Sequence, residues 1–171
     1  NAEPLQSGEK AMLMGAQKKL LQARNKRVRP GLDDKLLTSW NALMIKGYAD
    51  AAAALRNPEY LARALKAAQF LQDNARRDDG GLWRNHKDGK SSINAFLDDY
   101  AQTIQAFVRL YELTFDEQWL REGETLANYA LEHFDNPESN LLFYTSDLDP
   151  PLVSRRMEVK DNVVAGSNSA F

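Results

Sequence analysis

Two pairs of neighbouring aspartates, each near an aromatic residue, are the groups in this chain best suited to chemistry. Asp33-Asp34 is followed by Trp40, and Asp98-Asp99 is followed by Tyr100, 60 residues beyond Trp40. Paired carboxylates act as acid and base in glycoside cleavage, and an aromatic ring can stack on the apolar face of a pyranose. The pattern therefore predicts a carbohydrate site. Its candidate catalytic groups are Asp98, Asp99 and Asp34, and its candidate substrate-binding groups are Asp33, Trp40, Asn41, Tyr100 and Asn168.

A structural role competes with this interpretation at every one of these positions. Aspartate is a preferred N-cap residue, and a negative charge there is favoured by the helix dipole, so one aspartate of each pair is expected to cap a helix. Neighbouring residues in a helix point about 100° apart, which leaves the other aspartate able to face a cavity. The dipole also lowers a carboxyl pKa, so Asp98 or Asp99 fits a nucleophile, base or ligand-binding group better than an acid. Trp40 and Tyr100 equally suit a hydrophobic core.

The elements that must position these groups repeat along the chain. After a first helix, predicted over 7–24, an apolar helix over 38–55 is followed by an amphipathic one that starts at Asn57-Pro58. The same order returns with an apolar helix over 97–113 and an amphipathic one over 116–134, and 166–171 would open a third apolar helix. Helical pairs at a period of about 60 residues predict an all-α fold of consecutive α-hairpins, arranged as a toroid or a solenoid.

Short β-structure is predicted at two places between the helices. Asp88-Gly89 has the composition of a tight turn in a small hairpin. Leu141 to Thr145 resembles a short strand, and the turn at Asp149-Pro150-Pro151 allows a second strand at Leu152-Val153, so a β-hairpin is predicted near 141–155.

Composition excludes several classes of function. The net charge of −2 argues against nucleic acid as a partner, since phosphate binding needs an excess of lysine and arginine. The chain has no cysteine, and His86 and His133 lie far apart, so no metal site and no cofactor are expected. No apolar run is long enough to span a membrane, and 1–5 is not typical of a signal peptide, so we expect a cytoplasmic protein.

Several ordered motifs resemble one protein family. They are Arg27-Val28-Arg29-Pro30, Thr38-Ser39-Trp40-Asn41-Ala42-Leu43-Met44, Phe96-Leu97-Asp98-Asp99-Tyr100-Ala101 and Gly166-Ser167-Asn168-Ser169. The chain is similar, from about Arg24 to Phe171, to the spermatogenesis-associated, thioredoxin-domain-containing proteins. That resemblance implies that the consecutive α-hairpins form part of an (α/α)6 toroid, like those of N-acylglucosamine 2-epimerases and six-hairpin glycosidases. It also implies a thioredoxin-like domain ahead of the toroid in the full-length chain.

Two functions remain open at this point. The first is a toroid whose central funnel binds or processes a sugar, and the second is a non-catalytic scaffold that positions a thioredoxin-like domain for redox clients. We expect 1–171 to be a fragment of a single toroid domain that lacks the thioredoxin-like domain and the second half of the ring. Half a ring exposes the faces of its inner helices, which predicts self-association through those faces or partial disorder after about Pro137.

Overall fold

A computed structural model of the protein describes residues 6–150 and 153–171, which divide after Asp34 into two units. In the first unit, helix α1 (Ser7–Asn25) matches the predicted first helix and begins where the Gln6 N–H donates to Glu9 Oε2 at 2.9 Å. None of the residues in α1 is buried. Because the two units are separate bodies of contacts, a single domain over 1–171 stays a prediction.

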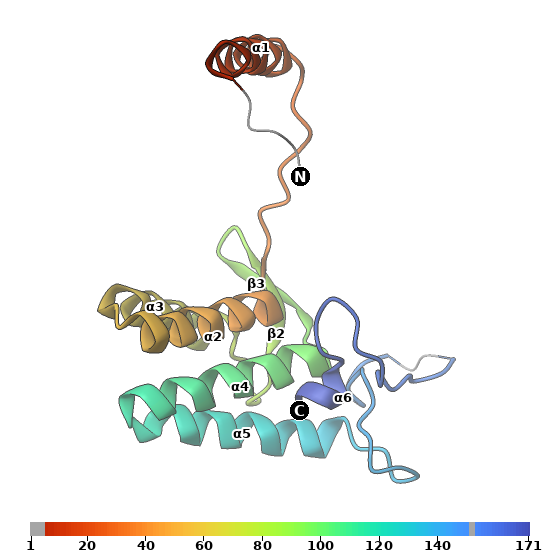
Figure 1. Cartoon of the computed structure of the whole chain (residues 1–171). Helices are drawn as coiled ribbons and strands as arrows, with labels where there is room; N and C mark the ends of the chain where they lie inside the picture. The colour runs from red at the N-terminus through yellow and green to blue at the C-terminus, as the bar shows by residue number, and fades with distance from the viewer. Residues whose placement is uncertain (1–5, 151–152) are drawn as a thin grey trace. The chain divides into compact units, whose positions relative to one another are not determined.

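The second unit contains two helical hairpins and the start of a third, as the repeat predicts (Figure 1). Its helices are α2 (Thr38–Leu55), α3 (Pro58–Ala75), α4 (Leu97–Thr114), α5 (Glu117–His133) and α6 (Ser167–Ala170). Helix α2 packs against α3 and α4 packs against α5, while α4 also contacts both α2 and α6. The helices α2, α4 and α6 are thus the inner series, while α3 lies mainly against α2 and α5 lies against α4.

Local sequence explains where these helices begin and end. The Asn57 side chain accepts a hydrogen bond from the Glu59 N–H at 2.9 Å, and Pro58 occupies the first helical position of α3. Asp116 caps α5 in the same way, accepting from the Gln118 N–H at 3.0 Å. Both inner helices α2 and α4 stop at a residue in the left-handed conformation, which reverses the chain into its outer helix.

The two hairpins are packed with side chains of different size. Four small residues of α2 and α3 are fully buried in the core, namely Ala42, Ala49, Ala64 and Ala68. Larger residues fill the interface of α4 and α5, where the rings of Phe107 and Trp119 lie 5.2 Å apart. Alanines let two helices approach closely, whereas aromatic rings stabilise the second hairpin through a larger buried area.

A three-stranded antiparallel sheet adjoins the start of α2. Strands β1 (Leu36–Leu37), β2 (Trp83–Lys87) and β3 (Lys90–Asn94) lie in that order, and β2 and β3 form the predicted hairpin. Its turn residues Asp88 and Gly89 have φ angles of 51° and 71°, as a two-residue hairpin turn requires. Strand β1 leads directly into α2, and the Thr38 hydroxyl donates to the Trp83 carbonyl at 2.6 Å, so the sheet holds the beginning of that helix.

The β-hairpin predicted near 141–155 is wrong for the part of this segment that the structure describes. No strand is assigned there, and Leu152 lies outside the described residues. The backbone groups find scattered partners instead. The Tyr144 N–H donates to the Arg156 carbonyl, whereas the Tyr144 carbonyl accepts from the Leu97 N–H at the start of α4. A short apolar run predicts an extended segment, but it does not show which groups its backbone bonds. Here the partners include a helix terminus and not a second strand.

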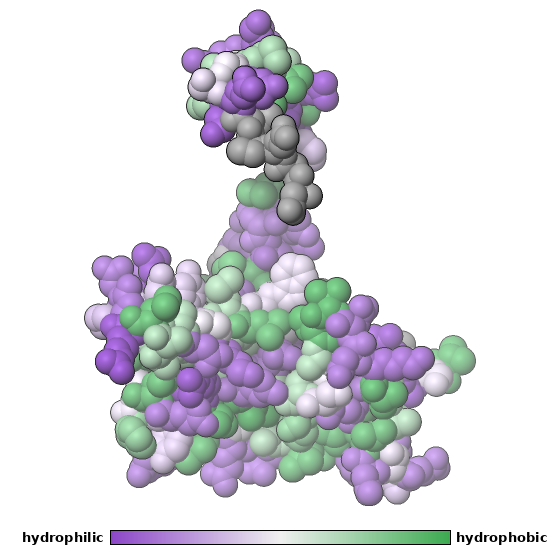
Figure 2. Space-filling view, in the orientation of Figure 1, coloured by the Kyte–Doolittle hydropathy of each residue, from purple (hydrophilic) through white to green (hydrophobic). Residues whose placement is uncertain are grey.

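Figure 2 shows apolar residues gathered in several places among hydrophilic ones on the visible face of the second unit. Three of the large exposed apolar residues belong to the inner helix α2, where Trp40, Met44 and Leu55 are more than half exposed. Self-association through inner-helix faces stays a prediction that fits this exposure. None of the described helices has the length and apolar character needed to cross a membrane.

Gly81 tests the packing that joins the loop before β2 to the second hairpin. A Cβ atom at this position would lie 2.7 Å from the Tyr129 hydroxyl oxygen and 3.0 Å from that of Tyr100. We expect Gly81→Ala to lower the free energy of unfolding by about 1–3 kcal/mol, because two stacked rings must shift. Gly47 in α2 has open space around it, so Gly47→Ala should raise stability by up to about 1 kcal/mol. Denaturant unfolding measures both, and equal effects would contradict the packing described.

Candidate functional site

Asp99 is a buried carboxylate that joins three elements. Its side chain is fully buried, and Oδ1 accepts a hydrogen bond from the Ser39 N–H, in the first turn of α2, at 2.9 Å. Oδ2 accepts from the Phe96 N–H, just before α4, at 3.0 Å, and from Arg84 Nη1 on β2 at 2.9 Å. One carboxylate therefore caps two neighbouring inner helices and pairs with the sheet, which fulfils the structural role expected for one member of the aspartate pair.

Burial raises the pKa of Asp99 to about 6, and the nearby Asp98 charge adds to the rise. The Arg84 guanidinium and the two backbone N–H groups oppose it by favouring the ionised form. The cost of removing the carboxylate from water therefore exceeds what these donors return. Asp99 is not among the residues that line the pocket described below, so it acts on that pocket through position and charge.

Asp98, the next residue toward the N-terminus, points into a pocket. Its side chain keeps 24% of its exposure, and Oδ1 lies 3.3 Å from Arg84 Nη1, which is a longer contact than the same nitrogen makes with Asp99. Asp98 follows the first residue of α4, so the rotation between successive helical residues turns the two carboxylates apart. The pair thus divides into one buried cap and one carboxylate open to a ligand.

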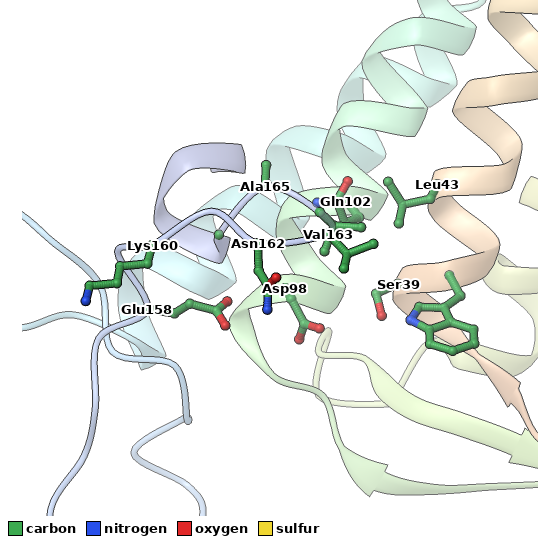
Figure 3. A pocket seen from close by; sticks show the side chains of 12 residues that line it. Ser39, Leu43, Asp98, Gln102, Glu158, Lys160, Asn162, Val163 and Ala165 are labelled. Atoms are coloured by element: carbon green, nitrogen blue, oxygen red, sulfur yellow. The ribbon is translucent and has the colours of Figure 1, made fainter.

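The pocket lies where the starts of α2 and α4 meet the loop before α6, and its volume is about 190 Å³ (Figure 3). Its polar lining comes from all three segments: Ser39 on α2, Asp98 and Gln102 on α4, and Glu158 and Asn162 in the loop. Trp40 also lines it, and 69% of this side chain is exposed. An accessible indole beside carboxylates and amides can stack on a sugar ring while the polar groups bond its hydroxyls. The volume suits one small ring.

The floor of the pocket contains a hydroxyl with no partner. Ser39 is only 3% exposed, and its Oγ forms no hydrogen bond within the described structure. The Oγ of Ser167, at the start of α6, is in the same state. The backbone N–H of Ser167 donates to Glu158 Oε2 at 3.0 Å, much as that of Ser39 donates to Asp99. A carboxylate from elsewhere in the chain therefore satisfies the first turn of both inner helices.

Tyr144 approaches the same carboxylates from the irregular segment after α5. Burial raises its pKa to about 12, and the charges of Asp98 and Glu158 add to this rise. The Arg156 guanidinium lies 4.6 Å from the centre of the Tyr144 ring, on its face. The phenol therefore stays protonated at neutral pH and can donate a hydrogen bond, but Tyr144 is not among the residues that line the pocket.

Three of the predicted site residues hold the structure together and lie outside the pocket lining. Tyr100 is fully buried and its hydroxyl accepts from the Leu82 N–H at 2.9 Å, so it is a core residue and not a stacking platform. The Asn41 amide donates to the Leu37 carbonyl at the start of α2. The Asn168 amide bonds both backbone groups of Leu142.

Asp33 and Asp34 are exposed and end the first unit. The sequence pattern predicted that they open a helix, and this prediction is wrong. Helix α2 begins only at Thr38, after strand β1. The pocket described above is formed by residues of the second unit without them.

Sequence reasoning missed Arg84, Gln102, Glu158, Asn162 and Tyr144. One of these carried a usable signal, since Gln102 lies four residues after Asp98 and so shares its helix face. Arg84 belongs to the predicted hairpin, but nothing local shows that it pairs with α4. Glu158 and Asn162 belong to a loop whose path depends on long-range contacts. Among the described residues, no group of three or more histidines, acids or cysteines is placed to hold a metal ion.

Comparison with known proteins finds distant relatives over most of the chain. No protein-family model matches it. "Spermatogenesis-associated protein 20" of Homo sapiens is 32% identical over 173 residues, which cover 94% of this chain and 22% of that protein. An uncharacterized protein of Caenorhabditis elegans is 33% identical over 151 residues, or 83% of this chain and 20% of its own length. The chain thus spans about a fifth of the length of the curated relatives it matches.

Solved structures of sugar enzymes share the fold. Cellobiose 2-epimerase from Spirochaeta thermophila superposes with a TM-score of 0.62 at 18% identity, over 71% of this chain and 33% of the enzyme. A GH76 α-mannanase from Bacteroides thetaiotaomicron gives 0.57 at 22% identity, over 69% of this chain and 32% of that one. The predicted fold of α-hairpins from an α/α toroid is therefore confirmed, and these likenesses carry the fold alone.

Replacement of the buried cap should change how stability depends on pH. Because the pKa of Asp99 is higher in the folded chain than its ordinary value of 3.8, the fold binds this proton more tightly than the unfolded chain does. Stability from this group is full below about pH 4 and is lost as the pH rises to about 6. Relative to Asp99→Asn, the unmodified chain should therefore lose up to about 3 kcal/mol between pH 4 and pH 7.

Urea unfolding at a series of pH values measures this difference. Asp73→Asn, on the exposed face of α3, is the matched control and should follow the unmodified chain because it leaves Asp99 in place. A constant difference between Asp99→Asn and the unmodified chain across this range would contradict the assignment of a raised pKa.

Proposed function

From the distant homology of this chain to spermatogenesis-associated protein 20 and from its α/α-toroid fold, we propose that it is a toroid module that binds a carbohydrate. The observation that carries the proposal is the pocket at the starts of α2 and α4, which an exposed tryptophan lines together with carboxylate and amide side chains. Apolar ring faces and hydroxyl-bonding groups in one small pocket match the two surfaces of a pyranose. Sugar enzymes of the same fold support this class of ligand.

Trp40 and Asp98 have distinct roles in this proposal. The indole of Trp40 stacks on the apolar face of the sugar ring. Because the indole is exposed, it is accessible for this contact. The Asp98 carboxylate accepts hydrogen bonds from sugar hydroxyls, and Gln102, one helical turn later, adds an amide on the same side. Asp99 is a positioning residue, because it holds the starts of both helices and shares Arg84 with Asp98.

The same lining is compatible with a reaction of the glycosidase or epimerase kind. Glycoside cleavage uses two carboxylates, and Asp98 and Glu158 are the two that line the pocket. Asp98, at the first turn of α4, would be the base or nucleophile of such a reaction. Glu158 would be the second group. The relatives extend far beyond this chain, so the rest of such a site would come from the remainder of a longer protein.

Sugar binding by variants of the pocket tests the proposal. We expect Trp40→Ala and Asp98→Asn each to weaken binding of a saccharide about tenfold or more, because each removes a surface of the site and one such contact contributes about 1–2 kcal/mol. Nuclear magnetic resonance titration with a panel of neutral hexoses and their disaccharides measures the affinities. Thermal unfolding should show that both variants remain folded.

Phe115→Ala is the matched control for the loss of an exposed ring. Phe115 is 77% exposed and ends α4 at the opposite terminus from Asp98, so this variant should bind like the unmodified chain. Failure of every saccharide to bind would contradict the carbohydrate function and would agree with a scaffold that only positions a thioredoxin-like domain. Equal weakening by Phe115→Ala would place the binding surface elsewhere.

A further inference from the structure

The charges that line the pocket have one predominant sign. Asp98 and Glu158 both contribute carboxylates, and Figure 3 shows the Glu158 side chain directed toward Asn162 and Asp98. Among the described residues that line the pocket, the cation is Lys160, which is exposed and extends its amino group away from Asp98 in the same view. A ligand group that enters between Asp98 and Asn162 therefore meets negative charge first.

The nearby arginine does not reverse this balance. Arg84 contacts two carboxylates at once, lying 2.9 Å from Asp99 and 3.3 Å from Asp98. When both aspartates are ionised, this group of three side chains has a net charge of −1, and Glu158 adds another. The closer partner of Arg84 is the buried Asp99, so its guanidinium is held at the wall and is not directed at a ligand.

The helix starts around the pocket do not form an anion site either. A helix N-terminus attracts anions through its free N–H groups and its dipole. Here the Ser39 and Phe96 N–H groups both donate to Asp99, and the Ser167 N–H donates to Glu158. The chain therefore places its own carboxylates where a phosphate or a carboxylate of a ligand would otherwise bind.

Uncharged polar groups complete the lining. Gln102 and Asn162 provide amides, and the Ser39 Oγ is nine-tenths buried with no hydrogen-bond partner in the described structure. A buried hydroxyl without a partner has lost its water contacts, so a ligand group that bonds it restores about one hydrogen bond. A sugar hydroxyl can both donate to a carboxylate and accept from an amide or hydroxyl, which an anionic oxygen cannot do.

We propose that this pocket selects uncharged saccharides and excludes sugars that carry a phosphate or carboxylate group. The proposal rests on the carbohydrate function proposed above and names the substrate class of the same site. Asp98 and Glu158 are the specificity-determining groups: each accepts from a neutral hydroxyl and repels an anionic substituent. Arg84 and the helix starts, which could have favoured an anion, are already occupied by Asp99 and Glu158.

Matched pairs of ligands test this selectivity. Titration of the chain with D-mannose and D-mannose 6-phosphate, and with D-glucose and D-glucose 6-phosphate, should show the neutral sugar of a pair binding about tenfold tighter or more. Glu158→Gln keeps an acceptor for the Ser167 N–H and removes one charge, so this ratio should fall, mainly through tighter binding of the phosphate. Raising the ionic strength from about 50 mM to about 500 mM should also lower the ratio of the two affinities in the unmodified chain. This measurement tests the selectivity even if the variant does not fold.

Glu124→Gln is the control for a change in net charge alone. Glu124 lies on the exposed face of α5, so this variant should keep the ratio of the unmodified chain. Binding of a phosphorylated sugar as tightly as its neutral partner would overturn the selectivity and leave the carbohydrate function in place. Failure of both members of each pair to bind would instead overturn the carbohydrate function itself.

Discussion

The buried carboxylate of Asp99 is the constraint on which the rest of the second unit depends. It satisfies backbone donors at the starts of two inner helices and pairs with an arginine of the sheet, so three elements share one charged group. Removing a carboxylate from water is costly, and the rise of its pKa to about 6 shows that these donors only partly compensate. Small buried residues such as Ala42 and Ala49 do not by themselves fix how far one helix is shifted along the next. The hydrogen bonds of Asp99 to both helix starts fix this register between consecutive hairpins.

The arrangement repeats in a modified form at the next inner helix. There Glu158, from an irregular loop, accepts from the Ser167 N–H at the start of α6. In both cases a carboxylate from elsewhere in the chain replaces a local N-cap, and both helices leave a buried serine hydroxyl without a partner. Because these caps come from other elements, the starts of the inner helices lie close together in the second unit. The loop before α6 packs against them. The pocket results directly from this packing, since its lining consists of the capped turns and the loop that supplies one of the caps.

The adjacent acid pair shows how one fold separates structural and ligand-binding roles. Asp98 and Asp99 are chemically identical and differ only by one helical step, yet one is fully buried and the other faces a cavity. Burial raises the pKa of Asp99, and Arg84 contacts both carboxylates. The likeness to epimerases and to a GH76 enzyme extends to the helical hairpins, while the identity of the ligand depends on side chains that vary within a shared fold.

Local chemistry was sufficient to predict the hairpins. Asn57-Pro58 and Asp116 start helices through side chains within two residues of the donors they satisfy, and Asp88-Gly89 forms a turn through its own backbone preferences. The 60-residue recurrence of Trp40 and Tyr100 likewise indicated the inner helices, but it did not show that one ring is exposed and the other is core. Only the tertiary structure decided that Asp99 is a cap and Asp98 a lining group, that Glu158 joins the site, and that residues 141–145 bond a helix start and not a strand. Those outcomes depend on burial and on partners as far as 60 residues away, and neither is encoded in the spacing of neighbouring residues.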